Sequence, residues 1–316
     1  MYFVTADCFR PSTGPFIMGF VAKHTSSWQW IYWIFATING IQFVLCLLLS
    51  PETIYLRNTP KPTSEKSTSW RKYVTINSIG TATISPHDFG TPFSLFMFPA
   101  IFIPAAAYSI IFGFCSVLLT VEIPQIFIPK WSFDPEQIGL QFLSLIIGSI
   151  IGEQLSGRGS DYWMRQERAR LGPSRRVRPE HRIWISYVGF LASIVGLVVF
   201  CVQVNNVSAD RYNITPLVGI AIAAFGNQVV TTVLVTFAVD SHPEHSASIG
   251  VFINLVRNTW GFISPFWFPY MLKNLGLKGS AGLMSGLILM ASVVPVMWLH
   301  RRGREPRKEG SDRTLD

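Results

Sequence analysis

Long apolar runs, each about the length needed to cross a lipid bilayer, constrain the fold of this chain more than any other feature of its sequence. An α-helix crosses about 30 Å of hydrocarbon with roughly 20 apolar residues. A shorter stretch, 12–23, has the length of half a helix. Because a membrane helix satisfies its own backbone hydrogen bonds, the pattern predicts an all-α integral membrane protein with about seven full helices and one partial helix. The full-length runs cover residues 29–50, 94–121, 136–154, 183–204, 216–239, 246–271 and 280–299.

The composition agrees with a membrane location and argues against a nucleic-acid-binding protein. Only 14% of the 316 residues are charged, against roughly 25% in soluble domains. The net charge is +8, and most Lys and Arg residues lie in three segments, with five in 51–92, eight in 155–182 and six in 301–316. The loops on the other side of the predicted membrane carry only five. Short cytoplasmic loops are rich in Lys and Arg. The charge therefore predicts a multi-pass protein in the lipid bilayer with both termini in the cytoplasm.

The polar segment 51–92 is rich in Ser, Thr and Pro and separates two apolar helices from the last six. It is the natural domain boundary. Its basic residues are either solvated or in contact with anionic lipid.

Two glycosylation sequons begin at Asn206 and Asn213, in a loop that this orientation places outside the cell. They agree with the topology, but such short motifs also arise by chance. Whether they are used stays open.

Arg257 lies near the middle of the run 246–271, where a charged side chain costs at least about 2.5–3.5 kcal/mol. Residues three and four apart share a helix face. We therefore expect Arg257 to face protein or a water-filled cavity, where it either meets a solute or fixes helix packing. The candidate counter-charges are Glu122, Asp240 and Glu153. The stripe that shares its face consists of Ser246, Gly250, Asn254, Asn258, Gly261 and Pro265.

Further polar residues interrupt the apolar helices. Asn227 and Gln228 carry amides that donate and accept hydrogen bonds, so they either orient a polar ligand or bond a neighbouring helix. Tyr108 is a further candidate on a solute path, together with Asn254, Arg257 and Asn258.

Two small-residue motifs permit close approach of helices, either within the fold or between copies. They are Gly148-x-x-x-Gly152 and Gly282-x-x-x-Gly286.

Enzymatic motifs are missing from the sequence. We find no G-x-S-x-G elbow, no phosphate-binding G-x-x-x-x-G-K-[ST] and no H-E-x-x-H. We therefore expect a protein that is not an enzyme, with no catalytic residues, no metal site and no cofactor. A transporter without a nucleotide-binding motif must use an ion gradient or carry its solute down a concentration gradient.

Several motifs together resemble fungal drug:proton antiporters of the major facilitator superfamily, which have 12 helices. Gly14-Pro15-x-x-x-Gly19 is similar to the end of the fifth-helix antiporter motif, and WQWIYW at 28–33 followed by Pro51-Glu52-Thr53 is similar to the sixth helix. Gly157-x-x-x-Asp161-x-x-x-Arg165 resembles the cytoplasmic motif between helices eight and nine. The segment 239–269, VDSHPEHSASIGVFINLVRNTWGFISPFWFP, resembles helices ten and eleven.

The resemblance implies the alternating-access fold, in which two six-helix bundles rock around a midplane site. Residues 1–50 would be the remnant of the first bundle, with part of helix five and helix six. Residues 51–92 would form the central cytoplasmic loop, 93–300 the second bundle and 301–316 a basic cytoplasmic tail. The resemblance further implies a location in the plasma membrane.

At the cytoplasmic side, the resemblance places Gly157, Asp161 and Arg165 in a gating network. Asp161 and Arg165 lie four residues apart on a helix, a spacing at which opposite charges form a breakable pair.

The sequence departs from the family pattern in its first residues. Met18 and Arg10 occupy positions of motif glycines, residues 1–13 do not resemble a membrane helix, and helices one to four have no counterpart. The leading hypothesis is a secondary transporter that exports small organic solutes with the proton as coupling ion. The alternatives are a non-transporting remnant, a subunit that needs a partner chain, and a seven-helix receptor with an external N-terminus.

Overall fold

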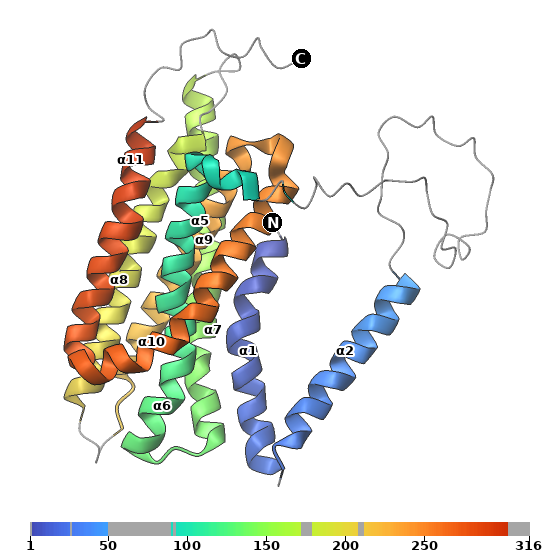
Figure 1. Ribbon diagram of the computed structural model, residues 1–316, viewed down its shortest axis with the longest axis vertical. Coiled ribbons are helices and arrows are strands. Elements are labelled where there is room, and N and C mark those ends of the chain that lie inside the picture. The colour runs from blue at the N-terminus through green and yellow to red at the C-terminus, as the bar shows by residue number, and fades with distance from the viewer. Residues whose placement is uncertain are drawn as a thin grey trace.

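The computed structural model describes residues 2–25, 27–49, 90, 93–171, 179–207 and 212–302. Within these ranges the regular elements are all helical (Figure 1). Short 3-10 turns at Leu95–Met97, Pro179–Arg182 and Pro243–His245 lie next to longer helices. The helices are α1 (Tyr2–His24), α2 (Gln29–Leu49), α5 (Pro99–Phe112), α6 (Leu119–Trp131), α7 (Pro135–Leu171), α8 (Ile183–Asn206), α9 (Thr215–Ser241), α10 (Ser246–Ile288) and α11 (Val294–Arg302).

Six helical stretches of the described chain are long and apolar enough to cross a membrane, which confirms the predicted all-α membrane fold. Each of the seven predicted runs overlaps one of them, and the last stretch, Ser246–Arg302, holds two runs. This stretch reverses direction at Gly276, whose φ of 67° and ψ of 173° are not helical. A positive φ is readily adopted only by glycine.

Several predicted helix bounds were too short. The run 94–121 belongs to a helix that continues from Pro99 to Trp131, because the π-helical segment Gly113–Leu118 joins α5 to α6. The stretch 12–23 is the second half of α1, which begins at Tyr2. Helix formation depends on backbone bonding and neighbouring helices as well as apolarity, so polar ends extend the elements beyond the apolar runs.

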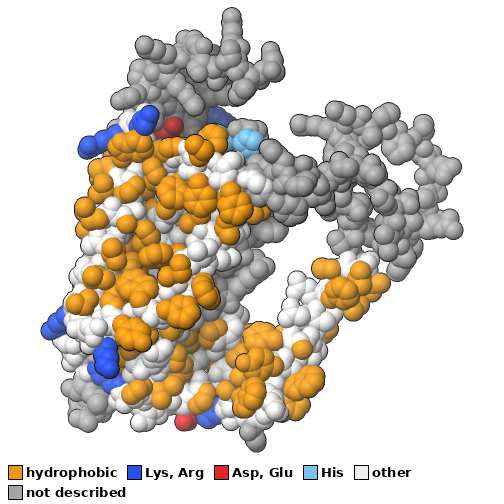
Figure 2. Space-filling model, viewed as in Figure 1, with side chains coloured by type: hydrophobic (Ala, Val, Ile, Leu, Met, Phe, Trp, Pro, Cys, Tyr) orange, Lys and Arg blue, Asp and Glu red, His pale blue; other side chains and the backbone are white. Residues whose placement is uncertain are grey.

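The bundle has two ends, with apolar side chains between them. Figure 2 shows hydrophobic side chains over this face of the bundle and Lys and Arg side chains near its two ends. The start of α1 and the end of α11 lie at the same end (Figure 1). This end also carries the junctions of α7 with α8 and of α9 with α10 and is called the loop end below. The turn between α6 and α7 lies at the far end.

Helix α9 is central and touches α8 and α7 through glycine seams. A Cβ built on Gly196 of α8 would lie 2.3 Å from the backbone nitrogen of Ala223, and one on Gly148 of α7 would lie 2.2 Å from the Ala221 oxygen. A Cβ on Gly152 would lie 2.8 Å from the Phe225 oxygen of α9, whereas one on Gly282 or Gly286 would have no described atom within 4 Å. The motif 148–152 therefore packs helices within the fold, and the motif 282–286 does not.

Candidate functional site

A small cavity lies inside the bundle, between α1, α5, α7, α9, α10 and the π-helical segment. Its volume of ≈ 10 Å³ is about what one water centre needs. An organic solute does not fit there unless the helices move apart. The lining residues are Ser12, Tyr108, Phe112, Cys115, Ser116, Leu145, Ser149, Ala224, Asn227 and Arg257.

Arg257 faces this cavity from α10. Its Nη1 donates a hydrogen bond to the Tyr108 hydroxyl at 3.2 Å, and its guanidinium carbon lies 5.0 Å from the centre of the Phe112 ring. The ring face attracts the cation. The Nε of Arg257 is buried and has no hydrogen-bond partner in the part of the chain that the structure describes. An unpartnered donor at a cavity wall is a group that a bound water or solute would satisfy.

None of the three carboxylates expected as counter-charges forms an ion pair with Arg257 in the described part of the chain. Asp240 pairs with Arg182, and Glu153 accepts hydrogen bonds from Gln228 and Thr232. The carboxyl of Glu122 is buried elsewhere. Arg257 instead contacts the phenol of Tyr108 and the ring of Phe112, because α5 places both residues beside it.

The two neighbouring amides of α9 have different surroundings. Asn227 lines the cavity and is 9% exposed, and its Oδ1 has no hydrogen-bond partner. Gln228 is fully buried and donates through Nε2 to Glu153 Oε2, to which the Thr232 hydroxyl also donates at 3.0 Å. Consecutive helical residues point in different directions. Asn227 therefore faces the cavity, and Gln228 bonds a neighbouring helix.

Asn254 and Asn258 do not reach the cavity. Both are exposed on α10, although they flank Arg257 in the sequence stripe. The cavity face of α10 is narrower than the predicted stripe. The serines at 12, 116 and 149 and the ring of Phe112 line the cavity but were not predicted, because single small or aromatic residues in apolar helices carry little sequence signal.

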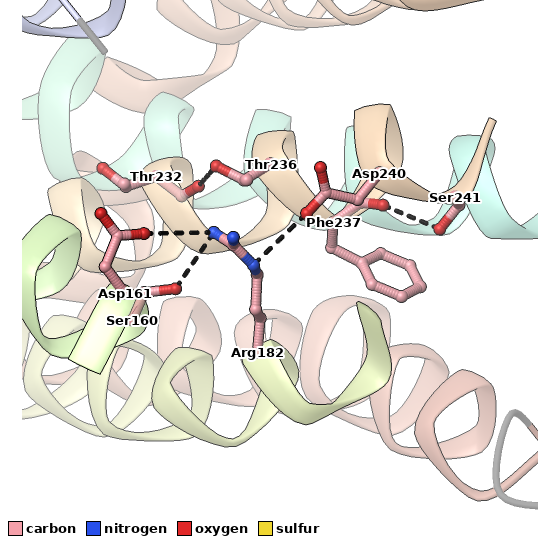
Figure 3. A network of polar contacts seen from close by, with 8 residues as sticks. All are labelled: Ser160, Asp161, Arg182, Thr232, Thr236, Phe237, Asp240 and Ser241. Atoms are coloured by element: carbon pink, nitrogen blue, oxygen red, sulfur yellow. Dashed lines mark hydrogen bonds and ion pairs between the residues drawn. The ribbon is translucent and has the colours of Figure 1, made fainter. Parts of the chain in front are cut away.

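A charge network at the loop end joins α7, α9 and the turn before α8 (Figure 3). Arg182 Nε lies 3.3 Å from Asp240 Oδ2, and its Nη1 lies 3.9 Å from Asp161 Oδ1 and 3.3 Å from the Ser160 hydroxyl oxygen. Gly157 is buried one turn before, whereas Arg165 is exposed. The predicted partner of Asp161 was Arg165; the ion pair found in the described chain is with Arg182, because the folded chain brings the start of α8 beside α7.

We expect Arg182→Ala to lower the free energy of unfolding by about 1 kcal/mol, since both carboxylates are about half exposed and screened by water. Arg182→Lys should recover only part of this loss, because it lacks the planar fork of arginine. The measurement is thermal unfolding of the purified protein at low and high salt. Arg165→Ala is the matched control, with an expected change near zero; equal effects of the two substitutions would contradict the assignment.

At the far end, α1 is held against α7. Lys23 Nζ lies 2.7 Å from Glu136 Oε2 and 3.7 Å from Asp134 Oδ2, and the hydrogen bond to Glu136 raises the pKa of Lys23. A Cβ on Gly19 would lie 2.6 Å from the Pro135 oxygen, so glycine permits this contact. Ion pairs therefore join the helices at both ends of the bundle.

The two sequon asparagines lie at the far end, near the end of α8 and the start of α9. Both are exposed. Asn213 Oδ1 accepts hydrogen bonds from the Thr215 backbone N–H at 3.1 Å and from its hydroxyl at 2.8 Å. Ser208 of the first sequon lies outside the described residues.

The described residues contain no group of three or more His, Cys, Asp or Glu side chains that could hold a metal ion.

A bundle of apolar helices around buried polar groups defines a multi-pass integral membrane protein. The chain belongs to the Major Facilitator Superfamily, whose family model matches residues 3–265. It is similar to the MFS-type transporter hepF of Aspergillus oryzae, with 26% identity over 91% of this chain and 58% of the relative. It is also similar to the efflux pump FUB11 of Gibberella moniliformis, with 24% identity over 96% of this chain and 51% of the relative.

A third relative, the efflux pump vrtL of Penicillium aethiopicum, is 27% identical over 86% of this chain and 53% of its own length. The chain thus spans about half the length of the curated relatives it matches. No solved structure matches it significantly.

Proposed function

We propose that the protein is a secondary active transporter that exports small organic solutes in exchange for protons. The observation that supports this most is the central cavity, where Arg257, Tyr108 and Asn227 meet from three helices of a facilitator fold. The relatives named as efflux pumps support the direction of transport. A guanidinium beside an aromatic ring suits solutes that carry an acceptor group on a flat or apolar body.

Alternating access supplies the mechanism of the proposal. The cavity is too small for an organic solute, so the state described here is closed. The network of Arg182 closes the loop end, and the pair of Lys23 with Glu136 closes the far end. We propose that these two sets of ion pairs break alternately. We further propose that the protein lies in the plasma membrane with its loop end facing the cytoplasm.

Transport by inside-out membrane vesicles tests the proposal. Vesicles containing the chain are given a proton gradient and a panel of labelled lipophilic acids and neutral aromatic compounds. We expect uptake of at least one compound that collapses when a protonophore is added. Uptake that survives the protonophore would refute proton coupling, and no uptake above empty vesicles would refute transport by this chain.

The apolar surface of α2 favours a second candidate, in which transport needs a further polypeptide segment. The membrane-crossing part of α2 is 0% buried, and Trp28, Trp30 and Trp33 are all exposed. In a bilayer such a surface contacts either lipid or a further helix. A tag on the chromosomal C-terminus tests this, because the mass of the native band and its co-purifying chains show what covers α2.

A further inference from the structure

Glu122 is a carboxyl group buried inside a membrane-crossing helix. It lies on α6, within the continuous stretch Pro99–Trp131. The residue is 3% exposed, and its Oε1 has no hydrogen-bond partner among the described residues. No ion pair of the described chain involves it.

Charged groups on the neighbouring elements are engaged elsewhere. Lys130, on the same helix, donates to the Val204 carbonyl. On α7, Glu136 pairs with Lys23 of α1. Arg257 of α10 is bonded to Tyr108.

The ring of Tyr212 contacts Trp131 of α6, and its hydroxyl donates a hydrogen bond to Gln141. Two further titratable groups near α6 are neutral thiols. These are Cys115 of the π-helical segment and Cys201 of α8, and both are free and buried. No described group therefore compensates a negative charge on Glu122.

An ionised carboxylate without a partner is very costly to bury, and such a group becomes neutral instead. Ionisable residues inside membrane helices commonly serve as ion sites or proton relays. We propose that Glu122 is a proton-binding site, which holds a proton in the closed state and releases it when water reaches the carboxyl.

The position of Glu122 connects this site to the central cavity. Cys115 lines the cavity and precedes Glu122 by two helical turns on the same helix, about 10 Å along its axis. Opening of the bundle around the cavity would bring water toward the carboxyl. The coupling role rests on the proposed transport function, whereas the bound proton does not.

Chemical modification tests the proposal on the full chain in lipid nanodiscs. Dicyclohexylcarbodiimide is apolar and reacts with protonated carboxyl groups, and peptide mass spectrometry locates the product. An ordinary glutamate is only about 0.2% protonated at pH 7. We expect Glu122 to be modified more than about ten-fold faster than Glu136 at pH 7, with modification falling as pH rises.

Infrared spectroscopy provides the second readout, in case the reagent does not reach the site. The spectrum should contain a protonated-carboxyl band at pH 7 that Glu122→Gln removes, with Glu136→Gln as the matched control. Absence of this difference together with no modification of Glu122 would overturn the proposal.

Transport measurements separate this inference from the proposed function. Uptake driven by protons with an ionised Glu122 would leave the function standing and reject the site. A protonated Glu122 in a chain that never couples transport to protons would confirm the site and reject the function.

Discussion

Arg257→Ala is expected to reduce transport by at least about 30-fold while the amount of protein in the membrane stays unchanged. Loss of a buried charged partner costs about 2 kcal/mol or more of binding energy. The fold should tolerate the change, because Arg257 is bonded to Tyr108 and stacked near Phe112 but closes no ion pair in the described chain. The measurement is uptake of an identified solute by vesicles with equal protein content.

Two further variants sharpen this test. Arg257→Lys should keep part of the activity, because it retains a charge but loses the guanidinium fork. Lys273→Ala removes an exposed charge from the same helix and should behave as the unsubstituted protein. Uptake at the wild-type level by the Arg257→Ala variant would contradict a role in solute binding. It would leave the alternative that the sequence also allows, in which Arg257 fixes helix packing.

Gly196→Leu is expected to remove the folded protein from the membrane. A Cβ at this position would lie 2.3 Å from Ala223 N and 2.7 Å from Gly219 O, both backbone atoms of α9. Overpacking against a side chain costs about 1–3 kcal/mol, and a backbone cannot turn away, so we expect about 3 kcal/mol or more. The measurement is the monodisperse fraction of a fluorescent fusion on size-exclusion chromatography.

Gly282→Leu is the matched control for this substitution. Gly282 is helical and exposed, and a Cβ there has nothing within 4 Å. Leucine is also the better helix former. The control should fold normally; a monodisperse Gly196→Leu protein would show that the seam between α8 and α9 is looser than described.

Helix α7 and the central cavity differ in how much of their structure could be predicted from the sequence. Helix α7 was predicted from its apolar half, and the motif 148–152 was predicted to permit close helix approach, which the contacts with α9 confirm. The inward position of Arg257 also followed from its cost in lipid, whereas the predicted polar stripe did not turn inward as a whole, because Asn254 and Asn258 are exposed. These are local properties, decided by residues a few positions apart in the chain.

Partners far apart in the sequence were not predictable in the same way. The pairing of Asp161 with Arg182, and the different surroundings of Asn227 and Gln228, depend on how helices are rotated and shifted against each other. A rotation of 100° per residue separates neighbours in the sequence, so a small change in helix register changes every contact.

The sequence by itself therefore determined that the chain forms membrane-crossing helices and that one arginine must turn inward, because apolar length and the cost of a charge in lipid depend only on local composition. The tertiary structure alone decided which groups surround Arg257, that Arg182 pairs with Asp161 and Asp240 at the loop end, and that Glu122 is buried with no cation from the described residues beside it. These features arise from the packing of distant helices, whose rotation and depth are set jointly by the glycine seams and side chains of all the elements that touch.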